Sequence, residues 1–326
     1  MSTKHIAYFD FLRGFAILMV VGIHTFPECS LNDSKDLLFI VLRQFLNCAV
    51  PIFLALSAFF LARKSFDSFE NIRSFWKKQI PKVYIPCLIW SLPLLFWAIN
   101  NGNNVLIEIV RLFICGYSIY YFIALIIQYY LLLPLLVSVD NLGARIFVVL
   151  SVVSISFYLY MGFHWPLILY AGPFWVWIMF FHQGIIMGKS DRNYPVLKLL
   201  ILILVFIILQ VIESSYIYKI NGVGFGIKAT AFLYSSFVLW LLFSKRIQSL
   251  YESRKNFFFT LIEYIGKLSF GIYLIHCYVI SLIGKLVGLE SWGIKWFITV
   301  VLTVTIIHIV KITLPFKFIS KYLGFL

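Results

Sequence analysis

The sequence contains little charge. Asp, Glu, Lys and Arg make up only 12% of its 326 residues, whereas 62% of the residues are hydrophobic. A soluble domain carries about 25% charged residues, so this composition excludes a soluble globular protein. No hydrophilic stretch is long enough to form a separate soluble domain. We therefore expect one integral-membrane domain over residues 1–326.

The apolar stretches also lack alternation with a period of two. They are continuous over about 18 to 22 residues, the length that a helix needs to cross the hydrocarbon core. A transmembrane β-barrel would alternate apolar and polar residues instead. The sequence therefore predicts an all-α polytopic membrane protein with about ten transmembrane helices. The expected spans cover residues 6–26, 38–61, 82–99, 119–137, 145–161, 170–188, 196–213, 226–243, 263–283 and 293–313.

Motifs for several common chemistries are absent as well. The sequence has no Walker A, G-x-G-x-x-G or G-x-S-x-G segment, and no H-x-x-x-H or H-E-x-x-H metal motif. The five cysteines form no C-x-x-C pair, and most lie in apolar runs. We interpret them as small apolar residues rather than as disulfides or metal ligands. We expect no metal.

The positive charges are concentrated on one side of the expected spans. A net charge of +14 could by itself indicate nucleic-acid binding. The positive-inside rule explains it better. With the N-terminus in the cytoplasm, nineteen Lys and Arg residues fall on the inner side and six on the outer side. We therefore predict an N-in, C-in topology in a lipid bilayer and no nucleic-acid partner.

The first expected span carries three ionisable residues within YFDFLRGFAILMVVGIHTF. Such groups are costly inside a bilayer unless they face protein or water. Arg13 and His24 lie within about 20° of one helix face, and Asp10 precedes Arg13 at ion-pair spacing. We interpret this stripe as the lining of a reaction path, with His24 as a general base, because imidazole titrates near neutral pH. The milder interpretation is a structural Asp10–Arg13 pair and a packing histidine.

Further polar residues lie in or near other expected spans. Arg43 is in the outer half of the second span and Ser57 in its inner half, and Glu28 is in the first outer loop. Tyr273 and His276 lie on one face of the ninth span. We group these five as substrate-binding or supporting candidates. For Tyr273 and His276, the alternative is a polar contact between helices without a catalytic role.

A basic segment, FWKKQIPKVYIPCLIW, leads into the third expected span. Its residues Lys77, Lys78 and Lys82 suit an anionic, phosphate-bearing donor. The alternative is that they only bind anionic lipid and set the topology. The aromatic run YSIYYFIALIIQYY, which contains Tyr120 and Tyr121, indicates an interfacial aromatic belt first and a substrate platform second.

Several of these segments resemble, in order, the motifs of acyltransferase family 3. Members of this family are membrane proteins that transfer acyl groups to extracytoplasmic carbohydrates and related acceptors. FDFLRGFAILMVVGIH is similar to the opening motif, whose Arg and His match Arg13 and His24. PIFLALSAFFLARK resembles the second-helix segment, with Ser57 at the Ser of its Ser-Gly-Phe core. KKQIPKVYIPCLIWSL, YYFIALIIQYYLLLPLL and GKLSFGIYLIH resemble later motifs.

The resemblance implies an O-acyltransferase. The donor would be acetyl-CoA from the cytoplasm, and the acceptor would be a glycan hydroxyl outside a bacterial inner membrane. His24 would accept the hydroxyl proton or carry the acyl group as an intermediate. Arg13 would hold the donor or orient the site, and Asp10 would fix Arg13.

The sequence departs from the family pattern at two places. The usual Arg-x-x-Arg pair is best matched by Gln79 with Lys82 or, with relaxed spacing, by Lys78 with Lys82. Lysine holds a phosphate as a point charge and lacks the two-pronged guanidinium. The usual Trp of the fourth-helix motif is Tyr121, which we group with Lys77, Lys78 and Lys82 in the donor site.

Two other function classes fit a polytopic protein with buried polar residues. The first is a transporter or flippase of a polysaccharide or lipid-linked sugar, although the sequence shows no convincing inverted repeat. The second is a non-enzymatic scaffold in an envelope complex. The sequence leaves open the acceptor glycan, the acyl group (acetyl or succinyl) and the oligomeric state.

Overall fold

The computed structural model describes residues 7–27, 37–139, 141–160, 167–190, 193–221, 226–287, 291–313 and 317–325. Within these ranges the secondary structure is helical and no strand is present. The longer helices are α1 (Ala7–Thr25), α3 (Ala49–Leu61), α4 (Phe69–Asn100), α6 (Tyr121–Leu136), α7 (Asn141–Tyr160), α9 (Phe174–Lys189), α10 (Val196–Asn221), α11 (Ala229–Leu242), α13 (Phe257–Lys267), α14 (Ser269–Val287) and α15 (Trp292–Thr313). The shorter ones are α2 (Leu37–Phe45), α5 (Val105–Phe113), α8 (Leu167–Ala171), α12 (Lys245–Ser253), α16 (Lys317–Tyr322) and the 3-10 helices η2 (Leu46–Cys48) and η3 (Ser118–Tyr120).

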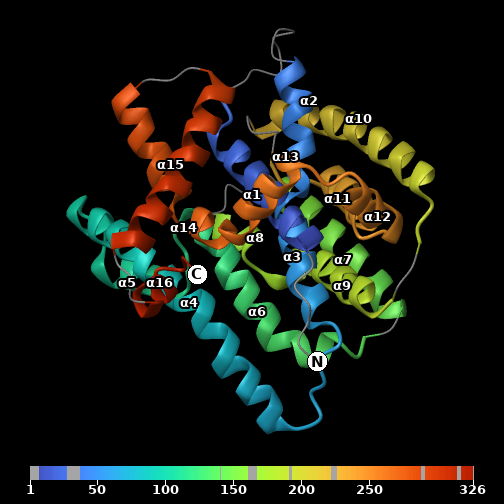
Figure 1. The fold of residues 1–326 in the computed structure, drawn as a ribbon, viewed down its shortest axis with the longest axis horizontal. Coiled ribbons are helices and arrows are strands. Elements are labelled where there is room, and N and C mark those ends of the chain that lie inside the picture. The colour runs from blue at the N-terminus through green and yellow to red at the C-terminus, as the bar shows by residue number, and fades with distance from the viewer. Residues whose placement is uncertain are drawn as a thin grey trace.

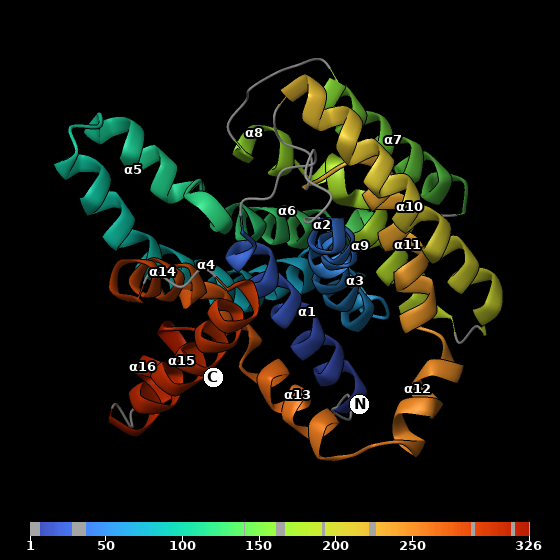
Figure 2. The ribbon, with the colours of Figure 1, turned by 90° about the horizontal axis from the view of Figure 1, so that it is seen from above.

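Helix α1 runs through the middle of the molecule (Figures 1 and 2). It packs against α3 on one side and against α13, α14 and α15 on the other. Seen from above, α7, α9, α10 and α11 lie beyond α3, and α4, α5 and α16 lie on the opposite side of α1 (Figure 2). Leu12, Ala16 and Ile17 of α1 are completely buried. Polar residues on α1 can therefore face protein instead of lipid.

The all-helical membrane fold is confirmed. Among the described residues, seven helices are long and apolar enough to cross a membrane, and the bent pair α13–α14 makes an eighth if it counts as one span. The described residues of the ten expected spans are mostly helical, and several of these spans combine more than one helix. However, α9 has 16 residues and α11 has 14, fewer than the about 20 that a typical span needs. The count of ten and the N-in, C-in topology stay predictions.

The basic segment before the third expected span is helical for most of its length. Helix α4 begins at Phe69, after the Ser68 hydroxyl accepts a hydrogen bond from the Asn71 backbone N–H at 3.3 Å. Lys82, the expected start of the third span, therefore lies inside a helix that begins at Phe69. A helix of 32 residues is about 48 Å long, more than the bilayer core requires. Its N-terminal end accordingly projects beyond the neighbouring helices (Figure 1).

The ninth expected span is two helices rather than one. α13 and α14 meet at a bend of 80° around Leu268. On α13, buried Glu263 pairs with Lys255 at 2.8 Å and accepts a hydrogen bond from Tyr251. These partners compensate the buried carboxylate. His276 lies beyond the bend, on α14.

Two glycines allow α1 and α13 to approach closely. A Cβ atom at Gly14 would overlap the Ile262 carbonyl oxygen, and one at Gly266 would overlap the Asp10 carbonyl oxygen. Small residues at helix contacts let backbones come together in membrane proteins, where packing replaces the hydrophobic effect as the driving force. This contact sets the position of the N-terminal half of α1, which carries Asp10 and Arg13.

Candidate functional site

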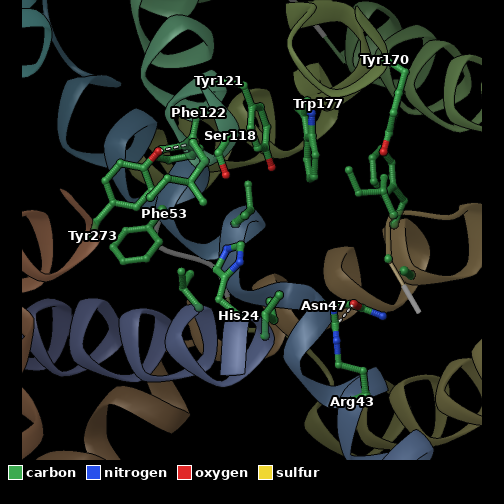
Figure 3. Close-up of a pocket in the computed structure, with 18 residues that line it drawn as sticks. His24, Arg43, Asn47, Phe53, Ser118, Tyr121, Phe122, Tyr170, Trp177 and Tyr273 are labelled. Atoms are coloured by element: carbon green, nitrogen blue, oxygen red, sulfur yellow. Dashed lines mark hydrogen bonds between the residues drawn. The ribbon is translucent and has the colours of Figure 1, made fainter. Parts of the chain in front are cut away.

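A cavity of about 240 Å³ lies beside the C-terminal half of α1 (Figure 3). Side chains from helices far apart in the sequence converge on it. The lining residues are Val20, Ile23, His24, Arg43, Asn47, Val50, Phe53, Ser118, Ile119, Tyr121, Phe122, Tyr170, Trp177, Gly226, Ile227, Ala231, Phe232 and Tyr273. A mostly apolar cavity with a few convergent polar groups is the usual form of a small-molecule site.

His24 projects into this cavity and is accessible there (Figure 3). Its ring centroid lies 5.2 Å from that of His276 on α14. The Nδ1 atom of buried His276 lies 2.8 Å from the Tyr273 carbonyl oxygen and 3.1 Å from that of Ile272. Because a carbonyl oxygen only accepts, these partners assign the proton to Nδ1 and leave Nε2 of a neutral His276 as an acceptor. The predicted candidates His24 and His276 are thus neighbours.

The two histidines and Cys277 form a set that could hold a metal ion. One nitrogen or sulfur atom of each lies within 4.8 Å of the others, and Cys277 Sγ is 3.5 Å from His276 Nε2. Imidazole nitrogen and thiolate sulfur are ligands that suit Zn²⁺. The expectation that the protein needs no metal stays a prediction. The spacing of His24, His276 and Cys277 in the sequence does not indicate this set, because the three residues come together only through the packing of α14 against α1.

Asp10 and Arg13 form the ion pair that their spacing predicts. Arg13 Nη1 lies 2.9 Å from Asp10 Oδ1. The Asp10 side chain is buried, whereas that of Arg13 is 32% exposed, and its guanidinium stacks 5.0 Å from the Phe60 ring centroid on α3. Neither residue lines the cavity. The pair therefore lies nearer the N-terminal end of α1, separated along the helix from His24.

Aromatic side chains make up much of the cavity wall. Tyr121, Phe122 and Trp177 lie on the side of the cavity opposite α1, and Tyr273 lies beside Phe53 (Figure 3). The Tyr273 hydroxyl donates to the Ile119 carbonyl oxygen. Flat rings of this kind provide large apolar contact surfaces for a ligand, with a polar tip on tyrosine.

The neighbouring Tyr120 has a structural role. It is buried within the bundle, and its hydroxyl donates to the Leu274 carbonyl oxygen at 2.7 Å. The aromatic-belt interpretation is therefore wrong for Tyr120. Tyr121, one residue later, faces the cavity (Figure 3).

Ser118 and Trp177 are cavity residues that sequence reasoning missed. Ser118 lines the wall with φ of 41°, a left-handed conformation that costs a non-glycine residue about 1–3 kcal/mol and is concentrated at functional sites. The Trp177 indole N–H donates to the Ala171 carbonyl oxygen at 2.8 Å, which orients its ring. Neither belongs to a motif with a chemical meaning, so only their position identifies them.

Polar residues from α2, η2, α10 and the start of α11 form a buried network behind one wall. Arg43 Nη1 donates to Asn47 Oδ1 at 2.7 Å, and Asn47 Nδ2 donates to Gln210 Oε1 at 2.8 Å. Lys228 Nζ donates to Gln44 Oε1 at 2.8 Å. Lys228 lies near the start of the expected span 226–243, and its side chain is completely buried. The sequence does not indicate that Lys228 is part of a buried network, because Lys228 stands in a weakly apolar stretch at the edge of an expected span.

The predicted donor lysines lie elsewhere. Lys77 and Lys78 border a surface depression on α4 with Arg73, away from the cavity lining. Lys64 stacks its ammonium 4.2 Å from the Phe75 ring centroid. Burial, and then the positive charges of Lys78 and Lys82, lower the pKa of the Lys64 ammonium. The structure thus gathers a basic surface at the N-terminal half of α4 and adds Lys64 to it.

Two candidates, Tyr121 and Ser57, lie apart from the groups that the prediction gave them. Tyr121 lines the cavity with His24 instead of joining Lys77 and Lys78. Ser57 is half-buried on α3 and does not line the cavity. Glu28 lies outside the described residues.

Comparison with protein families agrees with the motifs. A family model for the acyltransferase domain of family 3 matches residues 6–311, nearly the whole chain. No curated protein and no solved structure matches the chain significantly. The match includes α1 with Arg13 and His24, and α14 with His276. The chain is therefore a multi-pass membrane protein that belongs to acyltransferase family 3, whose members carry an acyltransferase domain.

Proposed function

We propose that the protein transfers an acetyl group from cytoplasmic acetyl-CoA to a hydroxyl of a carbohydrate on the outer side of a bacterial inner membrane. The observation that carries this proposal is the pair of His24 and His276 at a cavity with aromatic walls. Acyl transfer needs a base at the acceptor oxygen, and aromatic rings suit the apolar faces of a sugar. Membership of the family supports the reaction class.

In the proposed reaction, His24 accepts the proton of the acceptor hydroxyl as its oxygen attacks the thioester carbonyl carbon. The carbon–oxygen bond forms, the carbon–sulfur bond breaks, and the CoA thiolate leaves and takes the proton from the imidazolium. Nε2 of His276 is suited to accept from one ring N–H of His24. That hydrogen bond would leave the other ring nitrogen of His24 free to act as the base.

The donor would enter from the basic surface on α4. Lys64, Lys77 and Lys78 would attract the CoA phosphates, since lysine binds phosphate as a point charge. Helix α4 also touches α6: the Trp76 indole donates to the Tyr130 carbonyl oxygen at 2.9 Å. The thioester end would pass Arg13 on its way to His24. An acyl group on His24 would be the covalent version of the same transfer.

The test is acetyl transfer from labelled acetyl-CoA to envelope glycans by wild type and His24→Ala at matched protein levels. We expect His24→Ala to lose transfer by about 10²-fold or more, because it removes the base. His308→Ala is the matched control, since His308 lies away from the cavity and contacts Tyr264. Near-normal transfer by His24→Ala would contradict the proposal. Substrate movement without transfer by wild type would favour a flippase instead.

A further inference from the structure

The cavity has a positively charged wall that the transfer reaction itself does not require. Arg43 lines the same cavity as His24, and only 7% of it is exposed (Figure 3). A guanidinium stays charged at any physiological pH. Burial of such a charge is costly unless a charged or strongly polar partner compensates it.

The partners of Arg43 are neutral in the part of the chain that the structure describes. Its Nη1 donates to Asn47 Oδ1 at 2.7 Å, and its guanidinium lies 5.9 Å from the Phe26 ring centroid. No described carboxylate lies within ion-pair distance of it. A guanidinium has five N–H donors, and the Asn47 amide oxygen accepts from only part of them. The guanidinium therefore keeps donors for a ligand.

The network behind Arg43 contains a second basic residue. Buried Lys228 lies behind the same wall, where its Nζ donates to Gln44 Oε1 at 2.8 Å. Among the described residues, Glu213 is a carboxylate near Lys228, and it accepts from the Thr230 backbone N–H at 2.8 Å and from the Tyr160 hydroxyl at 2.6 Å. No ion pair between described residues joins Arg43 to Glu213, so this carboxylate does not compensate the guanidinium.

We propose that Arg43 binds an anionic group of the acceptor, so that the protein selects a carbohydrate that carries a carboxylate or a phosphate. This inference rests on the proposed function and specifies its acceptor class. The guanidinium forms two-pronged hydrogen bonds with either anion. Such a contact would hold the sugar in the cavity while its hydroxyl faces His24. Lys228 and Gln44 support the wall and are positioning residues.

Three glycosides of one sugar test the inference in purified protein: methyl glucoside, methyl glucuronide and methyl glucoside 6-phosphate. We expect wild type to show kcat/KM for at least one anionic glycoside about 10- to 100-fold above that for methyl glucoside, the range for a hydrogen bond to a charged group. A preference for the glucuronide alone or for the phosphate alone identifies the anion. Equal kcat/KM for all three overturns the inference.

Variants separate a binding role from a structural one. Arg43→Gln should reduce kcat/KM for the preferred anionic glycoside at least tenfold more than for the neutral one, and Arg43→Lys should keep part of the preference. Arg111→Gln is the matched control, because Arg111 pairs with Glu108 at 2.9 Å outside the cavity and should keep the full preference. Equal losses for neutral and anionic glycosides in Arg43→Gln would assign Arg43 to folding and overturn the inference.

A binding measurement distinguishes failure of this inference from failure of the proposed function. Ligands that bind the folded state raise the melting temperature. Without acetyl-CoA, we expect an anionic glycoside to raise the melting temperature of wild type more than the neutral glycoside does. In Arg43→Gln, the two glycosides should raise the melting temperature equally. That result without transfer to any glycoside would support the inference and contradict the proposed function. Acyl transfer to the glycosides, without any difference between them in kcat/KM or in melting temperature, would support the proposed function and overturn the inference.

Discussion

Two neighbouring histidines have different environments in this protein. His276 is buried and held by two backbone carbonyl oxygens, whereas His24 faces the cavity. A histidine with one nitrogen occupied by backbone has a defined tautomer, which makes it suited to orient a second histidine. His24 is free of that constraint and can exchange a proton with a ligand.

His276→Ala should lower kcat for acyl transfer by about 10- to 100-fold, as loss of an orienting partner does, with little change in KM for the donor. His276→Gln should recover part of the rate, since its amide oxygen can still accept from His24. The pH profile of kcat for both variants and wild type checks the role. An unaltered kcat and profile in His276→Ala would leave His276 as a packing residue.

Asp10 and Arg13 can be tested as a pair. Arg13→Ala leaves a buried carboxylate without this partner and should destabilise the protein by about 1–3 kcal/mol, less than a fully buried pair because Arg13 is 32% exposed. Asp10→Ala/Arg13→Ala should recover much of that stability in thermal unfolding. If Arg13 also acts on the donor, the double variant stays inactive. Recovery of activity together with stability would show a purely structural pair.

At the scale of elements, the contact of α1 with α13 determines where the polar residues of α1 lie. The sequence predicts one straight span at 263–283, but α13 crosses against α1 and α14 continues after a bend of 80°. The i, i+3 and i, i+4 rules act within one helix and contain no information on such a bend. The glycines at the contact identify it once both helices are in place.

Gly266→Ala should destabilise the protein because its Cβ atom would overlap the Asp10 carbonyl oxygen. Overpacking costs about 1–3 kcal/mol, partly offset by the better helix propensity of alanine. Gly284→Ala is the matched control on α14, since no atom lies within 4 Å of its added Cβ. Thermal unfolding in detergent checks this, and equal melting temperatures for the two variants would mean that the close contact is unnecessary.

At the scale of the whole molecule, the basic surface on α4 and the cavity at His24 are separate sites. The proposed reaction needs them on opposite sides of the membrane, which the charge bias predicts and the fold permits. Lys64 lies between α3 and α4, and Asn103 lies between α4 and α5. Both residues are exposed, so they report the two ends of α4.

In a background without native cysteines, a membrane-impermeant maleimide added to intact cells should label Asn103→Cys and leave Lys64→Cys unlabelled. Permeabilised cells should show labelling of both, which serves as the control for accessibility. The reverse pattern in intact cells would invert the predicted topology and place the basic surface outside, where cytoplasmic acetyl-CoA cannot reach it.

The sequence by itself determined what depends on neighbours along the chain. Hydrophobic length predicts the helices, and the three-residue spacing predicts the pair of Asp10 and Arg13. It also singled out His24, His276 and Arg43 as ionisable residues in apolar surroundings, because such groups are costly in a bilayer and need a reason to be there.

Only the tertiary structure decided which of these residues meet. His24 and His276 come together because α14 packs against α1, and Lys228 reaches Gln44 because α11 lies near α2. Tyr121 faces His24 instead of the lysines on α4 for the same reason. Helix contacts in a membrane depend on small residues and on the shapes of whole surfaces, and these leave no fixed spacing in a single sequence.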